Sequence, residues 1–319
     1  MTRTFEAAPE IIAIDTRMFG RQDVTSAYLV TGPRPALVET GSANVAEEVR
    51  AGLSSLGVGP DDLAHIVVTH IHLDHAGGAG TLAPHYPSAT VWVHERGAPH
   101  LADPSRLMAS AARIYGEDGL REMFGAVEPV PQERLRVVSD MEAVDLGEGR
   151  TLTALHTPGH ASHHVAILDS STGGVFVGDA LGVFLPDVRI LRPATPPPEF
   201  DLELAIGSIE RIRGVEPSRI LFSHFGPVAE VEHVTRLAIT RLERWTRIVE
   251  EALEETDDPA RVAALLREGT ARETNPAEVD AARKEGVSQR YEWLSSYEMN
   301  ASGIMRYLRK KREAAQAGS

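Results

Sequence analysis

The segment Thr69-His70-Ile71-His72-Leu73-Asp74-His75-Ala76-Gly77-Gly78 places three histidines and one aspartate within six positions. Imidazole and carboxylate groups are ligands of divalent metals. The residues just before the segment, Ile66-Val67-Val68, form a short apolar run that predicts a buried strand. A strand that ends in four metal-binding side chains indicates a metal site, and the number of side chains favours two metals.

The spacing within the segment supports this interpretation. His70 and His72 are two residues apart on an extended exit from the strand, so their rings can converge on one ion. Asp74 and His75 follow on the turn and can reach a second ion. The chain contains no cysteine, which excludes disulfides and thiolate ligands. Any metal must therefore be held by histidine and carboxylate.

Length and charge narrow the class of protein. A chain of 319 residues fits one large domain, or one domain with an appended subdomain. The formal net charge of -14 repels phosphate backbones, so we expect a small-molecule substrate and no nucleic acid. No stretch approaches the length of a membrane span, and the first ten residues lack the apolar core of a signal peptide. We expect a cytoplasmic protein that does not bind membranes.

The rest of the chain alternates apolar runs, turns and helical patterns. Strands are predicted at 11–14, 26–30, 36–39, 64–68, 90–94, 135–138, 151–156, 165–168, 174–177 and 219–222. Helices are predicted at 43–56, in an insertion at 98–124, and at 231–253, 260–267, 277–284 and 287–312. Two sheets packed face to face with helices outside would bury both sets of strands. We expect a domain over 1–230 and a C-terminal helical extension over 231–319, whose long helices are compatible with a homodimer.

Three further metal-binding side chains follow predicted strands. His160 comes after the strand that ends at residue 156, Asp179 after the strand that ends at 177, and His224 after the strand that ends at 222. Loops on a rigid scaffold are where functional residues gather. We therefore expect these three side chains to belong to the same site as the segment 69–78.

In order and context, these seven positions resemble the metallo-β-lactamase superfamily of hydrolases over roughly residues 10 to 228. The resemblance implies an α/β fold, the αββα metallo-β-lactamase sandwich. It further implies that one metal is held by His70, His72 and His160, that the other is held by Asp74, His75 and His224, and that Asp179 bridges the two. We expect two divalent ions, with Zn²⁺ as the first choice and Mn²⁺ or Fe²⁺ also compatible with these ligands.

The chemistry implied by the resemblance is hydrolysis. Two ions about 3.5–4 Å apart lower the pKa of a shared water and hold it as a bridging hydroxide, which attacks a carbonyl carbon or a phosphorus. Asp74 and Asp179 are the two carboxylates of the set, and we assign them as its catalytic residues. The preferred reaction is hydrolysis of an ester, lactone or thioester. The alternatives are a phosphodiesterase and a non-catalytic metal-binding protein on the same scaffold.

Two neighbouring positions are candidates for supporting roles. Glu39 stands where many relatives carry an aspartate, and it can accept a hydrogen bond from a ligand imidazole and fix its tautomer. The alternative is a strand end that faces solvent. His163 and His164 closely follow His160 and either line the pocket or begin the next strand.

Differences between this sequence and the known members narrow the choice among branches of the superfamily. The absence of cysteine and the presence of Asp179 separate the chain from the zinc β-lactamases. Asp179 is shared with glyoxalase II-like thioesterases, acyl-homoserine lactonases and ribonuclease Z-like phosphodiesterases. The lactonases usually carry a tyrosine three residues after this aspartate, where this chain has Gly182. A lactonase would need another donor, and Tyr115, Tyr291 and Tyr297 are the candidates.

The substrate pocket is harder to place. The segment 181–200 is a candidate pocket wall in which Arg192 can meet a carboxylate or phosphate. The alternative is an exposed arginine in a loop. The insertion 98–124 and the C-terminal helices are candidates for a lid, although their apolar spacing also fits plain helix packing.

Overall fold

The computed structural model describes residues 2–185, 188–274 and 281–317. These residues form two compact units. The core unit consists of Met1–His156, His163–Gly178 and Pro217–Ala229, and the helical unit consists of Thr157–Ser162, Asp179–Glu216 and Glu230–Ser319. The chain passes between the units several times, and one passage coincides with the predicted boundary at residue 230. The division into 1–230 and 231–319 stays a prediction.

The first sheet of the core unit contains β1 to β7 in sequence order. Strands β1 to β4 pair antiparallel, and β4 to β7 pair parallel. The carboxyl ends of parallel neighbours lie at one edge, so the residues that follow β4 and β5 leave the sheet side by side. The strands are β1 (Thr4–Ala8), β2 (Ile11–Asp15), β3 (Ser26–Val30), β4 (Ala36–Val38), β5 (His65–Val67), β6 (Thr90–His94) and β7 (Leu135–Val138).

The second sheet of the core unit has the order β15-β14-β11-β10-β9-β8. Strands β11 and β14 pair parallel, and the other neighbours pair antiparallel. The strands are β8 (Ala143–Gly147), β9 (Arg150–His156), β10 (Val165–Asp169), β11 (Gly174–Gly178), β14 (Arg219–Phe222) and β15 (Gly226–Val228). The ten predicted strands are all present, with ends that differ by at most one residue.

Alternation along the strands builds two apolar layers. Tyr28 and Val30 point into the layer between the sheets, where Tyr28 meets Phe176 of the second sheet at 5.2 Å between ring centroids. Ala27 and Leu29 point the other way, into the layer that packs under helix α1 (Ala46–Ser55). The strands β3, β4 and β5 are thus buried on both faces, which explains their continuous apolar sequences.

The core unit carries further helices beside α1. The predicted insertion at 98–124 is helical, but it consists of separate helices because Asp103-Pro104 and Gly116 interrupt it. The α-helices are α2 (Leu73–Ala76), α3 (Ala79–Leu82), α4 (Ala98–Ala102), α5 (Ser105–Tyr115) and α6 (Glu117–Phe124). Single 3-10 turns are η1 (Met18–Gly20), η2 (Ala43–Val45), η3 (Ala83–His85) and η4 (Gln132–Arg134).

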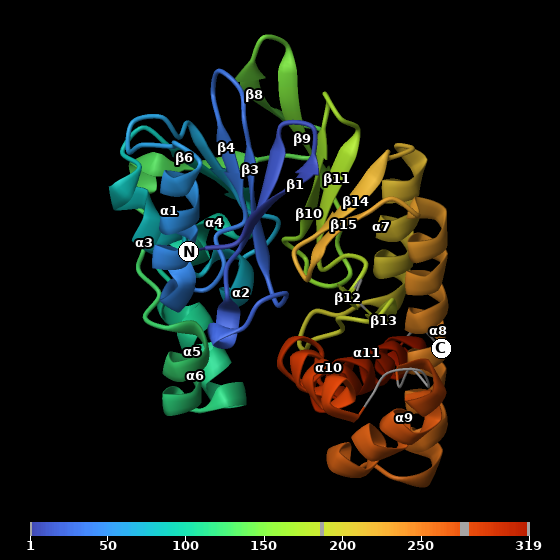
Figure 1. Cartoon of the computed structure of the whole chain (residues 1–319). Coiled ribbons are helices and arrows are strands. Elements are labelled where there is room, and N and C mark those ends of the chain that lie inside the picture. The colour runs from blue at the N-terminus through green and yellow to red at the C-terminus, as the bar shows by residue number, and fades with distance from the viewer. Residues whose placement is uncertain (1, 186–187, 275–280, 318–319) are drawn as a thin grey trace. The chain divides into compact units, whose positions relative to one another are not determined.

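The helical unit contains a two-stranded sheet and long helices (Figure 1). Its elements are β12 (Val183–Leu185), β13 (Ile190–Arg192), α7 (Leu202–Gly214), α8 (Val231–Glu255), α9 (Pro259–Thr274), α10 (Ala281–Leu294) and α11 (Tyr297–Ala317). The helix predicted over 287–312 is broken at Ser295-Ser296, between α10 and α11. Residues 277–280 of the helix predicted over 277–284 lie outside the described residues. Buried Trp245 of α8 stacks on Tyr297 of α11 with 5.4 Å between centroids. Among the described residues, every helix is too short or too polar to cross a membrane.

Candidate metal centre

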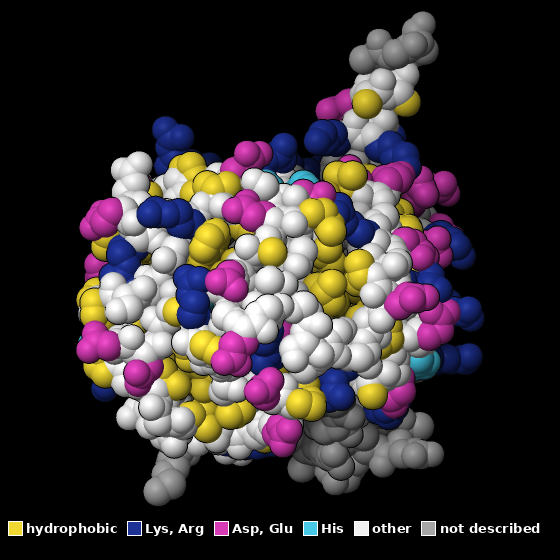
Figure 2. All heavy atoms as spheres, turned by 90° about the horizontal axis from the view of Figure 1, so that it is seen from above, with side chains coloured by type: hydrophobic (Ala, Val, Ile, Leu, Met, Phe, Trp, Pro, Cys, Tyr) yellow, Lys and Arg dark blue, Asp and Glu magenta, His cyan; other side chains and the backbone are white. Residues whose placement is uncertain are grey.

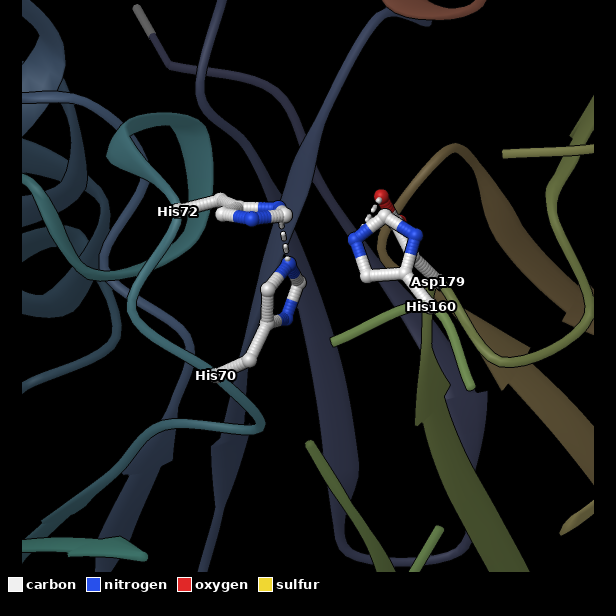
Figure 3. Close-up of side chains that lie close together, drawn as sticks. All are labelled: His70, His72, His160 and Asp179. Carbon is white, nitrogen blue, oxygen red and sulfur yellow. Dashed lines mark hydrogen bonds and ion pairs between the residues drawn. The ribbon is translucent and has the colours of Figure 1, made fainter. Parts of the chain in front are cut away.

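The metal-binding segment is positioned by β5 and by the short helix α2. The chain leaves β5 extended, which keeps His70 buried and brings its Nε2 to 3.1 Å from Nδ1 of His72 (Figure 3). His72 then caps α2, whose first turn contains Asp74 and whose last turn contains His75. The exit of a strand and the start of a helix thus carry the four side chains of the segment.

Three ligand atoms of the core unit lie within bonding range of a common ion. Asp74 Oδ2 lies 3.7 Å from His75 Nε2 and 3.4 Å from His224 Nε2, and the two Nε2 atoms are 3.1 Å apart. A tetrahedral ion with ligand bonds of about 2.0–2.1 Å places neighbouring ligand atoms roughly 3.3 Å apart. The spacing of this trio therefore fits a metal ion, and it unites residues separated by about 150 positions.

Hydrogen bonds at Nδ1 prepare the histidines of the core unit as ligands. His75 Nδ1 donates to Oε1 of Glu39 at 3.2 Å, and His224 Nδ1 donates to the carbonyl of Val24 at 3.3 Å. A carboxylate and a carbonyl can only accept, so each proton resides on Nδ1 and each Nε2 presents its lone pair. The Nε2 atoms are the ones that face each other, which is the tautomer that metal binding requires.

Glu39 accepts several of the hydrogen bonds in this arrangement. It follows β4 and is buried, with 1% of its surface exposed, which excludes the alternative of a strand end in solvent. Its Oε1 accepts from Thr69 Oγ1 at 2.5 Å and from Ser223 Oγ at 3.1 Å, in addition to His75. Its Oε2 is buried without a hydrogen-bond partner among the residues that the structure describes. A buried carboxylate is costly unless positive charge balances it, and a bound cation would supply that charge.

The hydroxyl of Thr69 continues the network to another ligand. Because Thr69 donates to Glu39, its oxygen can accept from His70 Nδ1, which lies 2.9 Å away. Neither Thr69 nor Ser223 is among the predicted site residues. Both directly precede a ligand histidine in the sequence, and that position was the available signal.

The helical unit contributes a second pair of candidate ligands. His160 Nε2 lies 3.5 Å from Asp179 Oδ2 (Figure 3), and His160 Nδ1 donates to the carbonyl of Ala194 at 2.9 Å. The proton of His160 therefore also resides on Nδ1, and its Nε2 presents its lone pair, as in His75 and His224. A small recess beside the two side chains is lined by Ala180, Leu181, Gly182, Pro193, Ala194, Phe200, Ala205 and Leu242. The segment 181–200 forms much of this wall, as the sequence indicated.

Gly182 occupies the position where the lactonases carry tyrosine, and its surroundings leave no room for a side chain. Its φ of +83° lies in the left-handed region, and a Cβ placed there would meet the carbonyl oxygen of Arg192 at 2.3 Å. The two tyrosines of the C-terminal helices do not replace the missing one. Tyr291 donates to the carbonyl of Ile190 at 2.6 Å, and Tyr297 is buried in its stack on Trp245.

Tyr115 is the third candidate donor. It lies at the end of α5, half-buried, with its ring 5.3 Å from that of Phe124. Burial, reinforced by the negative charge of Asp74, raises the pKa of Tyr115 to about 12. The phenol is therefore protonated at neutral pH and can donate a hydrogen bond, and its role toward a substrate stays a prediction.

Arg192 has a different environment from the one expected for a loop arginine. It lies in β13 with 3% of its surface exposed, and its guanidinium lies over the rings of Tyr291 and Tyr297 at 4.5 and 4.4 Å. Its Nη1 is 3.2 Å from Oε1 of Glu292. The charge of Arg192 is thus matched within the helical unit, and a contact with substrate stays a prediction.

His163 and His164 both lie beside His70. The fully buried ring of His164 is 5.0 Å from that of His70, between centroids, and the ring of His163 is 6.1 Å away and nearly parallel to it. Both precede β10, so the alternative that they lead into the next strand also holds. His164 packs behind a ligand instead of facing an open recess.

The comparisons with known proteins agree with this geometry. Residues 20–224 match the family model described as the metallo-beta-lactamase superfamily. The chain belongs to this superfamily. A relative named metallo-beta-lactamase fold-containing protein ST1585, from Sulfurisphaera tokodaii, is 32% identical over 53% of this chain and 63% of its own length. A hydroxyacylglutathione hydrolase from a Synechococcus strain is 28% identical over 62% of each chain. The chain thus covers less than two thirds of the length of these two relatives.

Solved structures show the same fold. The archaeal metallo-beta-lactamase superfamily protein ST1585 from Sulfolobus tokodaii matches 92% of this chain and 98% of its own, with a TM-score of 0.66 and 22% identity. The family protein TTHA1429 from Thermus thermophilus matches 90% of this chain and 89% of its own, with a TM-score of 0.63 and 21% identity. The predicted fold class is confirmed. The described residues also contain clusters of histidine and aspartate suited to a divalent metal.

Proposed function

We propose that the chain is a dinuclear metal-dependent hydrolase that cleaves a thioester, ester or lactone. The observation that carries the proposal is the trio of Asp74, His75 and His224, whose ligand atoms lie within 3.7 Å of one another. A structural ion would not require the acidic and neutral ligands of an open two-metal site.

The ligand assignment follows the order of the superfamily motif. His70, His72 and His160 would hold one ion, Asp74, His75 and His224 the other, and Asp179 would bridge them. The orientation of three imidazoles supports this assignment, because Nδ1 of His75, His160 and His224 is committed to an oxygen atom. Zn²⁺ is the preferred metal, since imidazole-rich sites suit it.

The protein's own residues would orient the reaction. Two bound divalent ions would supply Lewis acidity and an activated water. Asp74 and Asp179 are the carboxylates beside the ligand histidines, so they can accept a hydrogen bond from an attacking water and align it. Glu39 and the carbonyls of Val24 and Ala194 keep the imidazole planes fixed while charge develops.

The substrate class rests on the relatives and on the surface. One relative is named a hydroxyacylglutathione hydrolase, and another an atrochrysone carboxyl ACP thioesterase, which is 24% identical over 77% of this chain. This favours a thioester as the first substrate to test. On the face shown in Figure 2, acidic and basic side chains are interspersed, as suits a small-molecule hydrolase. The absence of room at Gly182 for a tyrosine ranks a lactone below a thioester.

The experiment combines metal analysis with a substrate panel. The purified chain is loaded with zinc, its metal content is measured, and it is assayed on a thioester, an aryl ester, a lactone and a bis-aryl phosphate. Two metals per chain and turnover of the thioester or ester support the proposal. Turnover of the phosphate alone would identify a phosphodiesterase. Two metals without any turnover would favour a non-catalytic metal-binding protein.

A further inference from the structure

We infer that the C-terminal helices α10 and α11 act as a brace that positions the candidate ligand His160, with Asn300 as the central positioning residue. The inference rests on the proposed function, because it treats His160 as a metal ligand. It concerns contacts within the helical unit alone. It gives the C-terminal helices a role other than the lid that their sequence suggested.

The brace acts on the segment Pro193-Ala194-Thr195. The carbonyl of Ala194 accepts the hydrogen bond from His160 Nδ1 and so fixes the plane and tautomer of that imidazole. This carbonyl and the N–H of Thr195 belong to one rigid, planar peptide group, and the carbonyl of Pro193 belongs to the group before it. Whatever holds Pro193 and Thr195 therefore holds the acceptor of His160.

Asn300 of α11 holds the Thr195 side. Its Oδ1 accepts from the backbone N–H of Thr195 at 2.8 Å and from Thr195 Oγ1 at 2.7 Å. Both residues are fully buried, so these hydrogen bonds are shielded from water. A buried amide that lost such partners would pay the desolvation cost of unpaired polar groups, which makes the arrangement well defined.

Ser295, in the break between α10 and α11, holds the Pro193 side. Its Oγ donates to the carbonyl of Pro193 at 2.6 Å and accepts from Asn300 Nδ2 at 2.8 Å. Asn300 Nδ2 also donates to the carbonyl of Ser296 at 2.8 Å, which ties the side chain to its own helix start. One network of hydrogen bonds thus fixes both residues that flank Ala194.

Gly303 allows the helix to come this close. A Cβ at this position would lie 1.8 Å from the carbonyl oxygen of Thr195, so only glycine permits the contact. Glycine inside a helix costs roughly 0.5–1 kcal/mol relative to alanine. Its presence in the middle of α11 is explained by the direct approach of the helix backbone to the segment 193–195.

The test measures zinc affinity and the visible spectrum of the Co²⁺-loaded full-length chain. Asn300→Ala should weaken the affinity of one of two metals by about tenfold, the lower end of the range for residues that orient a ligand. It should also change the Co²⁺ absorption bands, which report the geometry of the ligands. Asn300→Asp keeps the accepting oxygen and should lie closer to the unmodified chain.

Two threonine variants provide the matched comparison. Thr195→Val removes the hydroxyl that binds Asn300, and Thr235→Val removes an equally buried hydroxyl of α8 that donates to the carbonyl of Val231. We expect only Thr195→Val to alter the Co²⁺ spectrum. If Asn300→Ala does not fold, this pair decides the question.

The outcomes separate the inference from the proposed function. Two metals in the unmodified chain, with identical affinities and spectra in Asn300→Ala and Thr195→Val, would overturn the brace and leave the hydrolase intact. An equal effect of Thr235→Val would show that the effect of Thr195→Val reflects general stability, and would also overturn the inference. An unmodified chain that binds no metal would overturn the proposed function, and the inference with it.

Discussion

Oε1 of Glu39 lies 3.2 Å from Nδ1 of His75, and both side chains are buried in the core unit. The same oxygen accepts hydrogen bonds from the hydroxyls of Thr69 and Ser223. Each of these residues directly precedes a candidate ligand histidine. One carboxylate therefore links the loops after β5 and β14, although the two loops are far apart in the sequence.

This relationship predicts the effect of Glu39→Gln. The substitution preserves shape but removes the negative charge that strengthens the imidazole as a ligand, so metal affinity should fall by about tenfold or more. Affinity can be measured by competition with a chelator. Glu6→Gln is a suitable control, because Glu6 is an exposed carboxylate of β1 in the same unit. Unchanged metal content and turnover in Glu39→Gln would show that the carboxylate is not needed.

Removal of metal should abolish hydrolysis and destabilise the fold. Buried imidazole and carboxylate groups lie close together in the core unit. A bound cation would balance the negative charge and the lone pairs that they bring together. A ligand that binds only the native state at a hundred times its Kd stabilises it by about 2.7 kcal/mol. Dialysis against a chelator should therefore lower Tm by several degrees, and zinc should restore both Tm and turnover. Turnover that survives complete removal of metal would exclude the proposed chemistry.

The sequence predicted the ligand-bearing parts of the fold because each ligand follows a strand. His70, Asp179 and His224 come directly after apolar runs whose burial the structure confirms. Helix α7 is not among the predicted elements, although Asp201 caps its start by accepting from the N–H of Leu204. Its buried face contains alanine and serine, which weaken the apolar period. Strands β1, β8, β12, β13 and β15 are also absent from the prediction.

Parts of the site had no signal in the sequence. The acceptors for His160 and His224 are the backbone carbonyls of Ala194 and Val24, and any residue type supplies a carbonyl. The environment of Arg192 depends on Tyr291 and Glu292, which are about 100 positions away. Such contacts arise from the packing of the helical unit, and a single sequence does not specify which distant residues meet.

A buried ion pair in the core unit predicts the response to acid. Arg150 binds Asp169 through two hydrogen bonds of 2.8 and 3.0 Å. Burial opposes ionisation of Asp169, but the bonds from Arg150 and Thr172 outweigh it and lower the pKa of this carboxyl. A lowered pKa stabilises the fold at pH values above the unfolded pKa of about 3.9, and this contribution is lost as pH falls through the folded pKa.

Asp169→Asn tests this coupling. The variant removes the buried partner of Arg150 and leaves it only the exposed carboxylate of Glu10, at 3.1 Å, so it should unfold about 2 kcal/mol more easily at pH 7. Its stability should also depend less on pH below about 4 than that of the unmodified chain. Urea unfolding at pH 7 and below about pH 4 measures the difference in the free energy of unfolding between the two proteins. A parallel pH dependence in the two proteins would contradict the assignment.

Gly182→Ala should damage the helical unit next to the candidate ligand Asp179. The added Cβ would lie 2.3 Å from the carbonyl of Arg192, and φ at this position is +83°. Left-handed backbone costs a non-glycine residue roughly 1–3 kcal/mol even without a collision, and here β13 must move as well. Gly207→Ala in α7 is the control, because its Cβ meets nothing within 4 Å and alanine favours a helix. Thermal unfolding and metal content should fall in the first variant and hold or rise in the second. Equal stability of the two variants would show that this turn tolerates a side chain, and a tyrosine-bearing lactonase-like site would then become accessible by substitution.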